Sequence, residues 1–76
     1  MNLYLLTQTE NTCFIYYDSA VVVASDEEAA KLVLPYKGKE KYAYAWAGPK
    51  DIKVQLLGSS LETAPRLVMS SYRDDG

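Results

Sequence analysis

An unbroken apolar run over residues 20–24 constrains the fold of this chain more than any other feature of its sequence. The run reads Ala-Val-Val-Val-Ala, and valine favours extended backbone because its branched side chain packs well on a pleated sheet. Such a run is typical of a central strand that is covered on both faces. With 76 residues in total, the chain has room for one domain, residues 1–76, built on one sheet and one or two short helices.

The segment directly after this run predicts the start of a helix. Ser25 and Glu28 have the spacing of a capping box, in which each side chain accepts the backbone N–H of the other residue. Asp26 and Glu27 favour the same position because the N-terminal end of a helix is positive. Pro35 cannot continue a helix. We therefore expect one short helix over about residues 26–34.

Alternating apolar and polar residues predict further strands on both sides of this helix. The pattern indicates strands over residues 1–8, 51–57 and 66–72. Residues 14–17 are expected to form a short extended piece, which Asp18 and Ser19 separate from the apolar run. The last two strands are expected to pair antiparallel. The predicted fold is therefore α+β, a four-stranded, mainly antiparallel sheet in the order strand, strand, helix, strand, strand, with the helix on one face.

Composition argues against most catalytic chemistry. The chain contains no histidine and one cysteine, which removes histidine-based acid–base catalysis and most zinc sites. Cys13 has no neighbouring lysine or arginine to stabilise a thiolate, and it cannot form an internal disulfide. We therefore expect a protein that is not an enzyme and that uses no metal, cofactor or small-molecule substrate. No apolar stretch reaches the ~18–20 residues that span a bilayer, so we expect no membrane association and a cytoplasmic location.

The charges are distributed unevenly along the chain, although the net charge is only −2. The first 30 residues contain five carboxylates and no lysine or arginine, which is also what a solvated face would contain. Tyrosines beside such a surface are frequent anchors in protein interfaces. The candidate partner-binding residues are the acidic side chains of this segment and two adjacent tyrosines: Glu10, Tyr16, Tyr17, Asp18, Asp26, Glu27 and Glu28.

A second candidate surface lies between residues 36 and 46, where aromatic residues alternate with lysines. This composition is found in proteins that stack the bases and neutralise the phosphates of single-stranded nucleic acid. The candidate nucleic-acid-binding residues are Lys37, Lys39, Lys41 and Tyr44. The negative net charge opposes phosphate binding, and a solvated loop would have the same composition.

Two blocks of sequence resemble a known family. The opening M-N-L-Y-L-L-T-Q and the block Y-D-S-A-V-V-V-A at residues 17–24, with Trp46, Pro49 and a closing Ser-Ser-Tyr, are similar to small, uncharacterised accessory proteins of bacteriophages and prophages. The resemblance covers most of the chain, and the segment from Tyr36 to Tyr44 departs from it. It implies a phage origin and action in the host cytoplasm, and it carries over no catalytic residue.

Small acidic phage accessory proteins often inhibit host defences. We therefore expect an anti-CRISPR inhibitor that binds a host CRISPR–Cas effector complex and blocks target DNA access, because the DNA channels of such effectors are positively charged. Two alternatives stay open. One is a small nucleic-acid-binding module, and the other is a structural phage accessory protein that self-associates as a homodimer or larger assembly.

Overall fold

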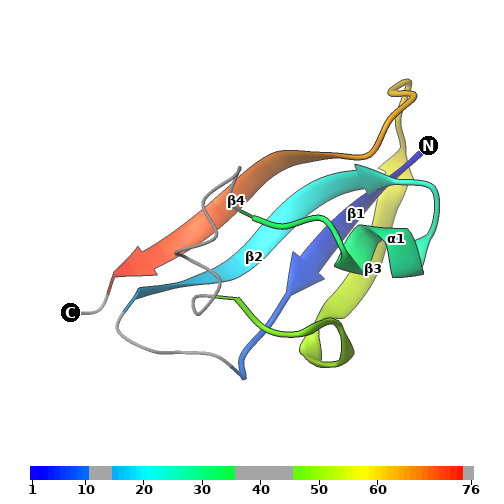
Figure 1. The fold of residues 1–76 in the computed structure, drawn as a ribbon. Coiled ribbons are helices and arrows are strands. Elements are labelled where there is room, and N and C mark those ends of the chain that lie inside the picture. The colour runs from blue at the N-terminus through cyan, green and yellow to red at the C-terminus, as the bar shows by residue number, and fades with distance from the viewer. Residues whose placement is uncertain (11–14, 36–45, 75–76) are drawn as a thin grey trace.

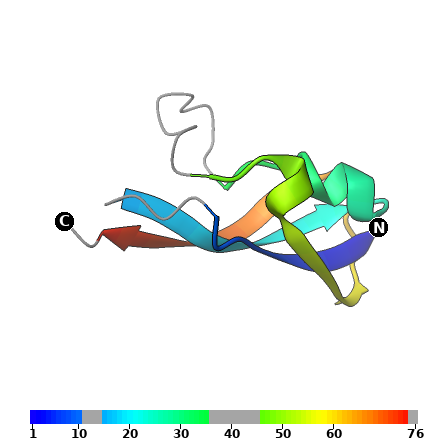
Figure 2. The same cartoon turned by 90° about the horizontal axis from the view of Figure 1, so that it is seen from below.

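The computed structural model describes residues 1–10, 15–35 and 46–74, whose strands form one sheet (Figure 1). A helix and a 3₁₀ turn lie on the same side of this sheet (Figure 2). In chain order the elements are β1 (Asn2–Thr7), β2 (Ile15–Ala24), α1 (Glu27–Lys31), η2 (Pro49–Asp51), β3 (Lys53–Ser59) and β4 (Arg66–Asp74).

The four strands lie in the order β3-β1-β2-β4, and every neighbouring pair is antiparallel. The predicted α+β fold with a four-stranded antiparallel sheet and one short helix is therefore confirmed for the described residues. The apolar run at residues 20–24 lies in β2, one of the two inner strands, as predicted. Its register against β1 runs from Asn2 opposite Ala24 to Thr7 opposite Ser19.

The expected pairing of the last two strands is wrong, because β3 and β4 lie at opposite edges of the sheet. The connection between them passes the end of the sheet where the N-terminus lies (Figure 1), and there the Ser60 N–H donates to the Met1 carbonyl oxygen at 2.8 Å. Leu6 and Val22 are fully buried in the inner strands, whereas β3 is mostly exposed. The most apolar strands thus take the centre, and the two later strands take the edges.

The expected break at Asp18 and Ser19 is also wrong, because β2 is continuous over ten residues. Its register against β4 shifts between Tyr17 and Ser19, so Asp18 is accommodated as a β-bulge. The Asp18 carbonyl oxygen accepts the Gln8 N–H at 3.1 Å, which keeps the strand attached to the end of β1. A polar pair that looked like a strand end is therefore an irregularity within one strand.

Helix α1 is shorter than predicted and has a different N-cap. It covers Glu27–Lys31, and the Asp26 carboxylate accepts the Ala29 N–H at 2.8 Å. The predicted capping box between Ser25 and Glu28 is therefore wrong, because the N-cap is Asp26, one residue later. Asp caps helices as well as Ser does. The helix ends at the Leu32 C-cap, where backbone N–H groups turn to i−3 carbonyls. Residues 32–34 therefore do not extend it.

Replacing Asp26 by alanine is expected to lower the free energy of unfolding by about 1 kcal/mol, because the Ala29 N–H loses its side-chain acceptor. Replacing Ser25 by alanine is expected to change it by less than about 0.5 kcal/mol. Urea unfolding of the two variants measures the difference, with Asp26→Ser as the matched control that keeps a capping oxygen. A larger loss of unfolding free energy for Ser25→Ala than for Asp26→Ala would contradict this prediction and favour Ser25 as the N-cap.

The core lies between the sheet and the side that carries α1. Alternation along β1 directs Tyr4 and Leu6 to this side, and both are buried, as is Gln8 just after the strand. The buried apolar cluster consists of Tyr4, Leu6, Ala20, Val22, Ala24, Ala30, Trp46, Ala47 and Ile52. Gln8 is the buried polar residue of the described chain, and its Nε2 donates to the Tyr17 carbonyl oxygen at 2.6 Å.

Candidate binding surfaces

Three neighbouring carboxylates lie exposed where α1 begins, and we call Asp26, Glu27 and Glu28 the acidic helix start. Asp26 is engaged by the Ala29 N–H, and the Glu28 Oε1 lies 3.8 Å from the Lys31 Nζ. The Glu28 side chain is nevertheless 87% exposed, so this ion pair leaves its carboxylate accessible. Glu27 and Glu28 can therefore contact a partner without breaking the helix cap.

The other two candidate carboxylates lie at the opposite end of the inner strands. Asp18 precedes Ser19, which pairs with Thr7, whereas Asp26 follows Ala24, which pairs with Asn2. The five residue steps from Ser19 to Ala24 separate the two ends by about 17 Å. The structure therefore divides the predicted acidic residues into two groups and does not join them in one surface.

Glu10 belongs to the second group and lies among residues of mixed charge. It lines a cavity of about 170 Å³ at the end of β1, together with Asp51 and Lys53. Thr7, Gln8 and Thr9 complete the lining. Lys53 offsets part of the negative charge here, so a basic partner finds less attraction at Glu10 than at the acidic helix start.

The two candidate tyrosines are less exposed than expected, because both lie within β2 and are partly buried. Tyr17 packs against the buried core, and its ring lies 5.1 Å from that of Tyr72 at an interplanar angle of 58°. Such a tilted pair is a favourable aromatic arrangement within a fold. Tyr17 is thus a structural side chain, and Tyr16 keeps only part of its surface for a partner.

The candidate nucleic-acid-binding residues Lys37, Lys39, Lys41 and Tyr44 lie outside the described residues, as does Cys13. Their role stays a prediction from the sequence. The described basic residues close to this segment along the chain are Lys31, which pairs with Glu28, and Lys50, which is exposed in η2.

The edge strands carry a set of exposed apolar side chains that the sequence analysis missed. On β3 these are Leu56 and Leu57, and on β4 they are Val68, Met69 and Tyr72, with exposed fractions from 41% to 63%. The alternating pattern assigned half of each strand to a core. An edge strand has a neighbour on only one side, so its apolar residues are covered less completely than the pattern indicates.

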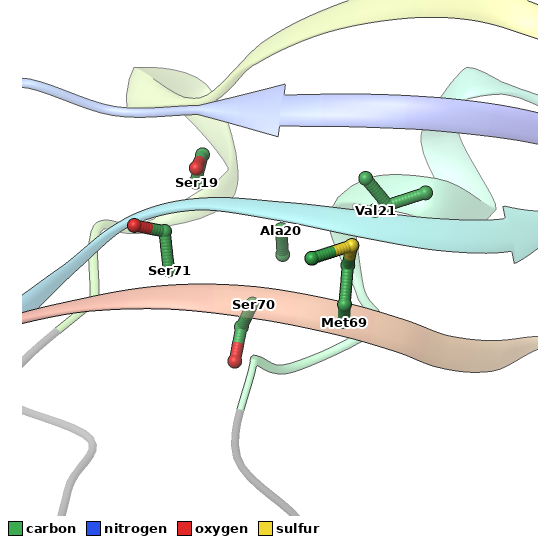
Figure 3. A pocket seen from close by; sticks show the side chains of 6 residues that line it. All are labelled: Ser19, Ala20, Val21, Met69, Ser70 and Ser71. Carbon is green, nitrogen blue, oxygen red and sulfur yellow. The ribbon is translucent and has the colours of Figure 1, made fainter.

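A shallow depression lies between β2 and β4 on the sheet face away from α1. Its volume is about 70 Å³, and Figure 3 shows the Met69 side chain extending from β4 toward Val21 on β2. Ser19 and Ser71, which are paired in the register, border it on the same face. Small hydroxyls beside apolar side chains suit contact with another protein better than capture of a charged small molecule.

The described part of the chain contains neither a candidate metal site nor a helix that could span a membrane. Within residues 1–10, 15–35 and 46–74, no three acidic, cysteine or histidine side chains gather as a metal site would require. The described helices are likewise too short to cross a bilayer.

Comparisons with protein families, with curated proteins and with solved structures find no match for this chain. Its function is therefore inferred from its own residues and from their placement in the fold.

Proposed function

We propose that this chain is a phage-encoded inhibitor that binds a host CRISPR–Cas effector complex and blocks its access to target DNA. The acidic helix start is the observation that carries the proposal. It presents Glu27 and Glu28 to solvent at a position fixed by the Asp26 cap and by the packing of the buried Ala30 on the sheet.

Fixed carboxylates can compete with DNA phosphates for a positively charged channel. CRISPR effectors hold nucleic acid in such channels, and charge complementarity speeds association and selects the partner. Because the backbone that carries these carboxylates is held by a folded element, little backbone freedom is lost on binding. The resemblance to phage accessory proteins supports the same setting, in which the partner is a protein complex of the host.

Exposed charges alone give little affinity, so the surface needs apolar contacts beside them. Leu32 supplies one, since it is 70% exposed and follows Glu28 by four residues, which is one helical turn. Leu34 is 44% exposed and lies two residues further along the chain. We therefore propose a contact in which Leu32 is the apolar anchor and the acidic helix start forms its charged rim.

The decisive experiment measures DNA binding by a host effector complex in the presence of the purified chain. The double variant Glu27→Lys with Glu28→Lys is expected to weaken inhibition at least about tenfold, because the rim becomes repulsive. Glu10→Lys is the matched control and is expected to inhibit like the natural chain, since Glu10 lies at the other end of the sheet. Asp26 is left unchanged so that the helix cap stays intact.

Two outcomes would contradict this proposal. Undiminished inhibition by the Glu27→Lys/Glu28→Lys variant would show that the acidic helix start makes no contact. The second outcome is a pull-down from host lysate in which the chain recovers nucleic acid without any effector subunit. If this recovery is lost when Lys37, Lys39 and Lys41 are replaced by glutamate, the nucleic-acid-binding module is favoured instead.

A further inference from the structure

The connection between the two edge strands, residues 60–65, is held in place by hydrogen bonds at both of its ends. At its start the Ser60 N–H donates to the Met1 carbonyl oxygen at 2.8 Å, and the Ser60 hydroxyl accepts the Glu62 N–H at 3.1 Å. At its end the Arg66 Nε donates to the Glu62 Oε1 at 2.9 Å, and the Arg66 Nη2 lies at the same distance from that oxygen. The backbone of the connection is therefore largely set before any partner binds.

Leu61 lies between Ser60 and Glu62, the residues that fix this connection, and it is fully exposed. Single exposed leucines are common on protein surfaces, and one on a mobile loop loses binding energy to the ordering of that loop. Here the neighbours on both sides are already bonded, so Leu61 is presented at a small entropic cost. Ser60, Leu61, Glu62 and Thr63 also line an open hollow of about 460 Å³, which can admit a side chain of a partner beside the leucine.

This connection lies at the same end of the sheet as the acidic helix start. Asn2 pairs with Ser59 on one side and with Ala24 on the other, so the ends of β3 and β2 are two strand spacings, or about 10 Å, apart. Arg66 pairs with Val23, so the connection passes the point where β2 leads to α1 before it reaches β4. Figures 1 and 2 both show α1 and the connection at one end of the sheet. A partner that approaches this end therefore meets both elements.

The two elements fit within one interface. A protein interface of standard size covers about 800 Å² on each partner, which is a patch about 30 Å across. The acidic helix start and the connection leave strand ends that are only about 10 Å apart. The Glu62 carboxylate is paired with Arg66, so the connection adds an apolar contact and little net charge to this patch. A positively charged surface that binds Glu27 and Glu28 is therefore not repelled by the connection.

We propose that this connection makes a second contact with the effector complex, in which Leu61 enters an apolar recess beside the basic surface that binds the acidic helix start. This inference rests on the proposed function, since the partner is the one that the carboxylates select. Binding energy concentrates in a few side chains that lose all contact with water in the complex, whereas exposed charges at the rim contribute less. Leu61 thereby adds an apolar anchor to the one that Leu32 supplies.

The test compares how strongly the natural chain and three variants inhibit DNA binding by the host effector complex. Leu61→Ser is expected to weaken inhibition at least about tenfold, because this leucine is buried only in the complex. Leu61→Met keeps a similar apolar volume and is expected to inhibit within about threefold of the natural chain. Leu56→Ser is the matched control, because Leu56 is a well-exposed leucine within β3, and it is expected to stay within about threefold as well. Circular dichroism checks that every variant is folded.

A second measurement reports contact at Leu61 directly. An environment-sensitive fluorophore is attached to the introduced thiol of Leu61→Cys in a Cys13→Ser chain. Its emission is expected to shift to shorter wavelength when the effector complex is added, because the label leaves water. The same label on Leu56→Cys is expected to show no shift. When Glu27→Lys and Glu28→Lys are added to the labelled Leu61→Cys chain, the shift is expected to require at least about tenfold more effector complex.

The results distinguish a failure of this contact from a failure of the inhibitor function. If the Glu27→Lys/Glu28→Lys variant loses inhibition while Leu61→Ser keeps it, and the label at position 61 shows no shift, the second contact is wrong and the inhibitor function is unaffected. The second contact is also wrong if Leu56→Ser weakens inhibition as much as Leu61→Ser does. If the natural chain leaves DNA binding by the effector unchanged and neither label shifts, the inhibitor function is wrong and the second contact is wrong with it.

Discussion

Replacing Leu6 by alanine is expected to remove about 3 kcal/mol from the free energy of unfolding. Leu6 is fully buried in an inner strand and belongs to the apolar cluster beneath α1. A chain of this length has a total stability of only about 4–11 kcal/mol, because folding free energies are about 0.05–0.15 kcal/mol per residue. The variant therefore loses a large share of its stability through one cavity.

Trp46 provides the probe for this measurement, since it is the single tryptophan of the chain and is 6% exposed in the same cluster. Its fluorescence should follow urea unfolding, with the midpoint falling in proportion to the lost stability. Leu61→Ala is the control, because Leu61 is fully exposed in the connection between the edge strands and should change stability by less than about 0.5 kcal/mol. Equal costs for the two variants would mean that the cluster around Leu6 is not the core.

Replacing Gln8 by glutamate is expected to cost about 3 kcal/mol at neutral pH, although the two side chains have nearly the same shape. The Gln8 side chain is buried, and its Nε2 donates to the Tyr17 carbonyl oxygen at 2.6 Å. A carboxylate has no hydrogen to donate, so two acceptors would face each other in a buried place. The substitution also buries a charge.

This cost is expected to depend on pH in a defined direction. Burial raises the pKa of the introduced carboxyl above its value in the unfolded chain, so the folded state binds the proton more tightly. The variant is then closest to the natural protein below about pH 4, and it loses stability as the pH rises through the raised pKa. Urea unfolding at about pH 4 and pH 7 checks this, with Gln8→Met as an uncharged control. A Gln8→Glu variant that is more destabilised at the lower pH would contradict it.

The sequence predicted the fold class because its two strongest patterns are local. The apolar run at residues 20–24 and the acidic segment after it define a buried strand followed by a helix, and both are present. The strand order was not accessible in this way. The segments that begin at Lys53 and Arg66 have similar alternation, and this pattern does not tell that the first pairs with β1 and the second with β2, which places them at opposite edges.

The same distinction applies to the candidate sites. Exposure of Glu27 and Glu28 follows from the position of a helix start and was predictable. The partial burial of Tyr17 was not, because it results from a contact with Tyr72, 55 residues further along the chain. The choice of Asp26 over Ser25 as the cap also depends on where β2 ends, since either side chain can accept the hydrogen bond.

The strand order also determines when the sheet can be completed during synthesis. β1 and β2 are near neighbours in the chain and can form a hairpin early, but the outer edge of β1 is covered only when β3 has been made. Until then the nascent chain holds an inner strand with an open edge, which is the condition that favours misassembly with other chains. Pairing over about 50 residues is also slow to form. The last third of the polypeptide therefore supplies the strand that covers the outer edge of β1. A chain whose synthesis stops before residue 53 would lack this strand and could not complete its sheet.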